Sequence, residues 1–128
     1  MKYYISSVRN DHNNIKLISN ELNRIGHICI YNWWDTDKNN KRDNYEIAFN
    51  KVQAIEATEL YICLMPFSRN TATEFGLALG SRCGKRIIIW SNNPNDFDND
   101  FMNTYMMHPS VSLMSCSMNK FLEYLKTL

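Results

Sequence analysis

Short apolar runs alternate with longer amphipathic segments along the whole chain. Apolar residues at Ile15, Ile18, Leu22 and Ile25 recur every three or four positions, a spacing that places one apolar stripe along a helix. The run at residues 60–65 is apolar throughout, as expected of a central parallel strand that is covered on both faces. The alternation therefore predicts strands separated by helices.

These patterns give the expected bounds of each element. Strands are expected at residues 2–6, 27–31, 60–65, 86–90 and 111–114. Helices are expected at residues 11–25, 43–57, 73–83 and 118–125, with a short one at 101–106. Gly26 is expected to end the first helix in a left-handed conformation, and Asp43 to cap the start of the second. Pro66 has no backbone donor and should end the third strand at its carboxyl end.

Strands that alternate with helices at this spacing are joined by right-handed crossovers. We therefore expect an α/β fold, a three-layer flavodoxin-like sandwich with a mostly parallel five-stranded sheet between two layers of helices. The length of 128 residues supplies one sizeable core but not two. Residues 1–128 are accordingly expected to form a single domain.

Charge and composition exclude several kinds of partner. The chain has 14 Lys and Arg against 13 Asp and Glu, and no segment concentrates the basic residues. Neither a nucleic acid polymer nor an acidic membrane surface is therefore expected as a partner. Residues 1–10 contain too few consecutive apolar positions for a secretory signal, and no apolar run has the length of a membrane span.

The cysteines indicate the redox state of the chain. Four are present, without a CxxC pair and without a histidine at metal-ligand spacing. Reduced thiols in the cytoplasm are the expected state, with Cys29 and Cys63 acting as small apolar residues inside strands. The sequence accordingly predicts no metal and no cofactor.

Polar residues gather in the loops that follow the predicted strands. In an open α/β sheet these loops converge at the carboxyl ends of the strands and form the ligand crevice. Hydroxyl and amide groups there can bind sugar hydroxyls or a phosphate, and indole rings offer a stacking face. The candidate ligand-binding residues are Ser6, Ser7, Arg9, Asn32, Trp33, Trp34, Ser68, Asn70, Thr71, Glu74 and residues 91–93.

A carboxylate, Glu74, lies where the third strand gives way to the third helix, within Thr-Ala-Thr-Glu-Phe-Gly-Leu-Ala-Leu-Gly at residues 71–80. Other segments accompany it in order: Tyr-Tyr-Ile-Ser-Ser at 3–7, Tyr-Asn-Trp at 31–33, Ala-Ile-Glu-Ala-Thr-Glu at 54–59 and Gly-Lys-Arg-Ile-Ile at 84–88. Over about residues 1–91 the chain resembles the nucleoside 2-deoxyribosyltransferase-like superfamily. Its most specific match is Glu-Phe-Gly-Leu-Ala at 74–78, ahead of a Gly-Lys pair and an apolar strand.

The resemblance implies an enzyme that cleaves or transfers at the N-glycosidic bond of a nucleoside, a deoxynucleoside or a nucleoside 5′-monophosphate. The superfamily's nucleophile is a glutamate, and it falls on Glu74. A carboxylate there stabilises the oxocarbenium-like state of such a cleavage and can trap it as a glycosyl-enzyme. The residues that fall in segments lining the sugar or phosphate pocket are Ser6, Ser7, Ser68, Asn70 and Thr71.

Two further residues are candidates for substrate contacts. Arg9 is a candidate partner of a 5′-phosphate, and Trp33 is a candidate stacking surface for the base. Members of the superfamily often assemble, so a homo-oligomer is expected. Methionines crowd the last third of the chain and are candidates for its interface. These methionines are Met102, Met106, Met107, Met114 and Met118.

Several of these residues also have a structural interpretation. Thr71 to Glu74 fits a capping box, in which Glu74 bonds backbone amides at the start of its own helix. A place in the first helical turn would also favour the ionised carboxylate through the helix dipole. Trp33 and Trp34 are equally typical of a core next to a strand end.

One position departs from the superfamily pattern. An acidic residue commonly holds or protonates the departing base one helical turn before the position of Ile55, whereas this chain has Lys51 there. The acid is therefore unassigned. Candidate replacements are Asp35, Asp37, Asp43 and Glu46, of which the two on the predicted helix, Asp43 and Glu46, are more typical of a solvated helix face.

Two other functions fit the same fold. Toll/interleukin-1-receptor-like domains also combine a flavodoxin-like sheet with a catalytic glutamate, and they cleave a nicotinamide dinucleotide. A non-catalytic nucleotide-binding module is the other alternative, and Lys51 at the position of the expected acid is its main support.

Overall fold

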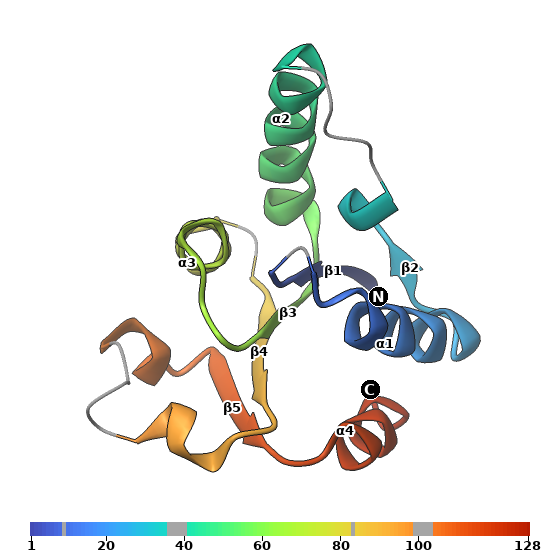
Figure 1. The fold of residues 1–128 in the computed structure, drawn as a ribbon, viewed down its shortest axis with the longest axis vertical. Coiled ribbons are helices and arrows are strands. Elements are labelled where there is room, and N and C mark those ends of the chain that lie inside the picture. The colour runs from blue at the N-terminus through green and yellow to red at the C-terminus, as the bar shows by residue number, and fades with distance from the viewer. Residues whose placement is uncertain (9, 36–40, 83, 99–103) are drawn as a thin grey trace.

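The computed structural model describes residues 1–8, 10–35, 41–82, 84–98 and 104–128 (Figure 1). The strands are β1 (Lys2–Ser6), β2 (Ile28–Cys29), β3 (Leu60–Leu64), β4 (Arg86–Ser91) and β5 (Val111–Ser115). They form a five-stranded sheet in the order β2-β1-β3-β4-β5, and every neighbouring pair is parallel. This arrangement confirms the predicted α/β class with a parallel five-stranded sheet, and its strand order is that of the flavodoxin-like fold.

Helices cover both faces of the sheet. They are α1 (His12–Arg24), α2 (Lys41–Ala57), α3 (Arg69–Leu79) and α4 (Met118–Leu125), with short 3₁₀ turns η1 (Trp33–Asp35), η2 (Pro94–Phe97) and η3 (Thr104–Met107). The helices α1 and α4 pack together on one face, and α2 and α3 pack together on the other (Figure 1). From β1 the chain runs to β2 at one edge of the sheet and then crosses back to β3 on the other side of β1. The strand order therefore reverses between β1 and β3, and sheets of this kind bind ligands at such a point.

The predicted bounds agree with the structure at several elements and differ at others. Residues 2–6 and 118–125 form β1 and α4 as predicted. The edge strand β2 is limited to two residues, because only Lys2 and Tyr3 of β1 pair with it. The helix α2 begins at Lys41, so Asp43 lies inside it and the prediction that it is the cap is wrong. Of the short helix predicted at 101–106, residues 101–103 lie outside the described part, and η3 covers the rest.

Two of the predicted chain breaks are confirmed. The helix α1 ends at Arg24, and Gly26 adopts a φ of 97°, the left-handed conformation that glycine takes without a steric penalty. The strand β3 ends at Leu64, just before the peptide bond between Met65 and Pro66. The loop between β3 and α3, which leads to Glu74, therefore begins where the sequence predicts.

Side chains of β1 alternate between the two faces of the sheet, as a period of two requires. The Tyr3 hydroxyl lies 2.8 Å from both Ser19 Oγ and Asn23 Oδ1 on α1. Tyr4 and Ser6 point to the opposite face, toward α3. Their partners in the register on β3 are Tyr61 and Cys63, and the Tyr4 and Tyr61 rings stack with centroids 6.1 Å apart. A row of hydroxyl and thiol groups therefore lies beneath α2 and α3.

The methionine-rich last third does not form an exposed face in its described part. Met106 is buried in the core, and Met114 and Met118 pack against that core, whereas Met107 is exposed. Met102 lies outside the described residues. Met106, Met114 and Met118 therefore serve packing within the fold, as expected of flexible apolar side chains.

None of the described helices combines the length and apolar character that a membrane span needs.

The described cysteines Cys29, Cys63 and Cys116 are free thiols, and burial raises the pKa of the Cys63 thiol well above its usual value. Cys63 is buried on β3, as predicted, whereas Cys29 on β2 is only partly buried.

Alkaline titration is expected to separate the tyrosines into two groups. Burial raises the pKa values of Tyr3, Tyr4 and Tyr61, and the nearby Glu74 carboxylate raises that of Tyr4 further. A raised pKa means that the fold favours the neutral phenol. This stabilisation is complete below pH about 10 and is lost as the pH rises above it. Ultraviolet difference spectroscopy should therefore show these three of the seven tyrosines ionising only on unfolding.

The same titration in denaturant supplies the control, because all seven tyrosines should then ionise together near their ordinary pKa. Native protein that ionises all of them with an unchanged circular dichroism spectrum would contradict the described burial.

Candidate active site

Glu74 is a buried carboxylate held by three other side chains. It lies on α3 with 6% of its surface exposed. Its Oε1 accepts a hydrogen bond from the Tyr4 hydroxyl at 3.0 Å and lies 3.1 Å from Lys51 Nζ. Its Oε2 accepts a hydrogen bond from Ser6 Oγ at 2.5 Å. Since these partners come from β1 and α2, the carboxylate joins three elements that are distant in the sequence.

The capping interpretation of Glu74 is wrong in this structure. Ser68 caps α3 instead: its backbone is extended and its Oγ accepts the Thr71 backbone N–H at 3.1 Å. The hydroxyls of Ser68 and Thr71 also lie 2.8 Å apart. With the helix beginning at Arg69, Glu74 lies in the second turn and not in the first, where the dipole acts most strongly. The charge that faces the carboxylate is therefore that of Lys51.

Lys51 is placed between the carboxylate and an indole ring. Its side chain is 15% exposed, and its Nζ lies 4.4 Å from the centroid of Trp33, which is cation–π distance. Trp33 is buried, its indole N–H donates to the Ile5 carbonyl at 2.7 Å, and its ring meets Trp34 edge-on. Both tryptophans therefore lie in the core, and the ring face of Trp33 is turned to Lys51.

A cavity of about 330 Å³ opens beside this group, between α2 and α3. Glu74 and Lys51 form its charged wall, and its volume lies in the range of small-molecule sites. The rest of the lining is polar at Asn44, Asn70 and Thr73 and apolar at Ile47, Ala48, Val52, Ile55 and Leu77. A carboxylate in a largely apolar cavity with a few convergent polar groups is a typical reactive site.

Comparison with known proteins addresses the fold. No family model and no curated protein matches the chain. Among solved structures, the CMP N-glycosidase BcmB of Clostridium botulinum is similar with a TM-score of 0.72 and 16% identity, over 99% of this chain and 98% of its own. The 2-deoxyribosyltransferase of Bacillus psychrosaccharolyticus is similar with a TM-score of 0.67 and 14% identity, over 97% of this chain and 92% of its own.

The chain shares the fold of these two solved structures. In this fold the predicted site residues fall into two groups. Ser6, Asn70 and Glu74 lie at the cavity or touch the carboxylate, and Trp33 is linked to it through Lys51.

The hydroxyls of three other predicted residues bond groups other than the carboxylate. The hydroxyls of Ser68 and Thr71 are engaged in the cap of α3. The Ser7 hydroxyl donates to Asp11 at the start of α1, at 3.3 Å. Arg9 lies outside the described residues.

The candidate acids do not lie beside Glu74 in the described part of the chain. Asp35 accepts the side-chain amide of Asn32 at 3.1 Å and lines a different cavity, and Glu46 is exposed on α2. Asp37 and the side chain of Asp43 lie outside the described residues. Among the residues described as lining the cavity, Glu74 is the one carboxylate and Lys51 the one cation.

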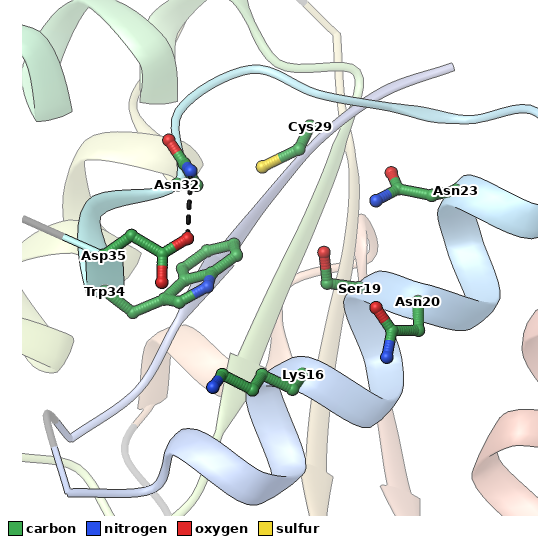
Figure 2. Close-up of a pocket in the computed structure, with 8 residues that line it drawn as sticks. All are labelled: Lys16, Ser19, Asn20, Asn23, Cys29, Asn32, Trp34 and Asp35. Atoms are coloured by element: carbon green, nitrogen blue, oxygen red, sulfur yellow. Dashed lines mark hydrogen bonds between the residues drawn. The ribbon is translucent and has the colours of Figure 1, made fainter.

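Two other cavities lie away from Glu74. One, of about 500 Å³, is bounded by α1 and the segment from β2 to η1, with Lys16, Asn20 and Asp35 in its polar lining (Figure 2). The other, of about 680 Å³, lies beyond the carboxyl ends of β1, β3 and β4. It contains Asp11, whose pKa is raised by burial, and Asp96, which accepts a hydrogen bond from Ser91.

Sequence reasoning missed three members of the group around Glu74. Tyr4 and Lys51 contact the carboxylate, and the Tyr61 hydroxyl is buried nearby with no hydrogen-bond partner among the described residues. Tyr4 was detectable, because it lies two positions before Ser6 and so shares its face of the strand. The sequence marks Lys51 as a departure from the superfamily pattern, but it does not indicate the contact with Glu74.

Proposed function

We propose that this chain cleaves or transfers at the N-glycosidic bond of a nucleoside or nucleoside 5′-monophosphate, with Glu74 as the nucleophile. The observation that carries the proposal is a buried carboxylate, fixed by Tyr4, Ser6 and Lys51, that opens on a cavity of small-molecule size. Support also comes from two structural neighbours that are named for an N-glycosidase and a deoxyribosyltransferase.

The hydrogen bonds around the carboxylate suit nucleophilic attack. Tyr4, Ser6 and Lys51 all donate, which matches an ionised carboxylate that only accepts. Oε1 receives two of these contacts and Oε2 receives one. Oε2 therefore keeps one lone pair free, and this lone pair can attack the anomeric carbon of the sugar. Attack expels the base and leaves a glycosyl-enzyme, which water or a second base then releases.

The surroundings of Glu74 suit a nucleoside. Asn70 and Thr73 supply polar groups for the sugar, while the apolar wall that includes Ile47 and Leu77 suits a flat base. Ser7, Ser68 and Thr71 follow β1 and β3 at the same edge of the sheet, and with Arg9 they remain our proposed contacts of the sugar or the phosphate.

Product analysis tests the reaction. Purified protein is incubated separately with cytidine, CMP, their deoxy counterparts and a nicotinamide dinucleotide, and the products are separated by chromatography. We expect free base from a nucleoside or nucleotide, in proportion to protein concentration. Free nicotinamide alone would favour the Toll/interleukin-1-receptor-like alternative, and tight binding without product would favour a non-catalytic module.

A second copy of the chain is the proposed partner of α2. Tyr45, Phe49 and Val52 are 79%, 63% and 43% exposed and follow one side of this helix beside the cavity. Exposed apolar residues at such spacing are typical of a subunit interface. Sedimentation analysis is expected to show a homodimer or higher assembly, and a Phe49→Glu variant should shift it toward the monomer.

A further inference from the structure

A lysine lies beside the proposed nucleophile. Lys51 Nζ lies 3.1 Å from Glu74 Oε1 and 4.4 Å above the Trp33 ring, and its side chain is mostly buried. The two charges cancel while Glu74 is a carboxylate. Among the described residues that line the cavity, Lys51 provides the one positive charge.

This balance changes during the reaction that we propose, on which the present inference rests. When Glu74 bonds to the anomeric carbon, it becomes a neutral ester, and Lys51 loses its counter-ion. A mostly buried cation without a partner is costly. The new negative charge in the cavity is on the base that has just departed. Lys51 has a flexible four-carbon stem that allows its ammonium group to turn from one anion to the other.

We propose that Lys51 is a catalytic residue that pairs with the departing base, and that it makes the enzyme selective for pyrimidine nucleosides and nucleotides. A pyrimidine leaves with its negative charge shared between N1 and the adjacent carbonyl oxygen O2, which accepts a hydrogen bond from an ammonium group. A purine leaves more readily when an acid protonates its ring nitrogen. The described cavity lining places no acid beside Glu74 for that purpose.

Charge and atoms balance through the cycle. A Glu74 oxygen forms a bond to C1′, and the C1′–N1 bond breaks with its electron pair passing to the base. The proton stays on Lys51 while that bond breaks, and the ammonium–carboxylate pair becomes an ammonium–base pair. The base takes a proton from water on release. Water that attacks C1′ frees Glu74 as a carboxylate and returns one proton to solution.

A leaving-group comparison tests this role. The substrates are 2′-deoxyuridine 5′-monophosphate and its 5-fluoro analogue, whose base is the more stable anion. In Lys51→Met, kcat for the parent substrate is expected to fall on the order of 10²-fold, as on removal of a preorganised donor. The fall in kcat for the 5-fluoro substrate should be at least about tenfold smaller than the fall for the parent substrate. Lys51→Arg keeps the charge and should recover most of the activity.

Lys16→Met is the matched control, because Lys16 is an exposed lysine of α1 that lines the cavity on the other face of the sheet (Figure 2). It should change neither substrate's kcat. Thermal unfolding of each variant shows whether the fold is retained. The wild-type protein gives a second test that needs no folding control. Its kcat/KM for a pyrimidine nucleotide should exceed that for the matching purine nucleotide by at least about tenfold, because the purine lacks a proton donor.

The outcomes separate this inference from the proposed function. Equal losses on both pyrimidine substrates in folded Lys51→Met, or a wild-type enzyme without the expected preference for pyrimidines, would overturn the role of Lys51 while the N-glycosidic reaction stands. Wild-type protein that releases no base from these nucleotides or from the matching nucleosides, with or without an added acceptor base, would instead refute the proposed function. A loss concentrated on the poorer leaving group, with recovery in Lys51→Arg, supports the inference.

Discussion

Glu74→Gln is expected to reduce turnover of a nucleotide substrate on the order of 10³-fold or more, the scale seen when a catalytic nucleophile is removed. Glutamine has nearly the same shape and can still accept the Tyr4 hydrogen bond through its side-chain oxygen. It cannot form the glycosyl ester. Steady-state kinetics should therefore show a collapse of kcat, with substrate affinity measured by calorimetry changing far less.

The same substitution at Glu46 is the matched control, because Glu46 is exposed on α2. Glu46→Gln should leave kcat within about twofold of the wild type, as is usual for a surface change. Glu74 also has a structural duty as the partner of Lys51, so unfolding must be measured beside activity. A Glu74→Gln protein with a lowered melting temperature but unchanged kcat would reduce Glu74 to that structural duty.

Phe121→Ala is expected to lower the free energy of unfolding by about 3–5 kcal/mol, the usual cost of emptying a buried aromatic site. Phe121 is fully buried on α4 and stacks on Trp90 of β4, with ring centroids 5.8 Å apart. Phe121 and Leu125 are the buried side chains of α4, so the substitution removes much of what holds this helix against the sheet. Urea denaturation followed by circular dichroism measures the change.

Leu122→Ala on the same helix gives the comparison, because Leu122 is only partly buried. Its loss should be about 1 kcal/mol. Equal effects of the two substitutions would mean that α4 does not dock through Phe121. The remaining folded Phe121→Ala protein should keep its kcat, since α4 lies on the face of the sheet away from Glu74.

Much of the fold was predictable because its signals are local. The apolar run of β3, the helical stripe of α1 and the left-handed Gly26 each depend on neighbouring residues, and each prediction is confirmed. The start of α3 was placed too late, because Ser68 competes with Thr71 as the cap and both can accept a backbone N–H. The hydrogen bond that decides between them depends on the extended backbone at Ser68.

The candidate site was only partly predictable. The motif around Glu74 located the carboxylate, but its contact with Lys51 depends on how α2 and α3 lie across the sheet. A local pattern holds no information on that arrangement. The tryptophans illustrate the same limit: their place after β2 fits a stacking surface or a core, and the packing of η1 against β1 decides for the core.

The described contacts of Glu74 have an evolutionary consequence. Tyr4, Ser6, Lys51 and Glu74 all come from the part of the chain before α3 ends, and the hydrogen bonds and ion pair described for Glu74 do not involve β5 or α4. Selection on the contacts of Glu74 therefore does not bear directly on β5 and α4. We expect homologues to diverge fastest in β5 and α4, and to gain new surfaces by changing them while the chemistry stays intact.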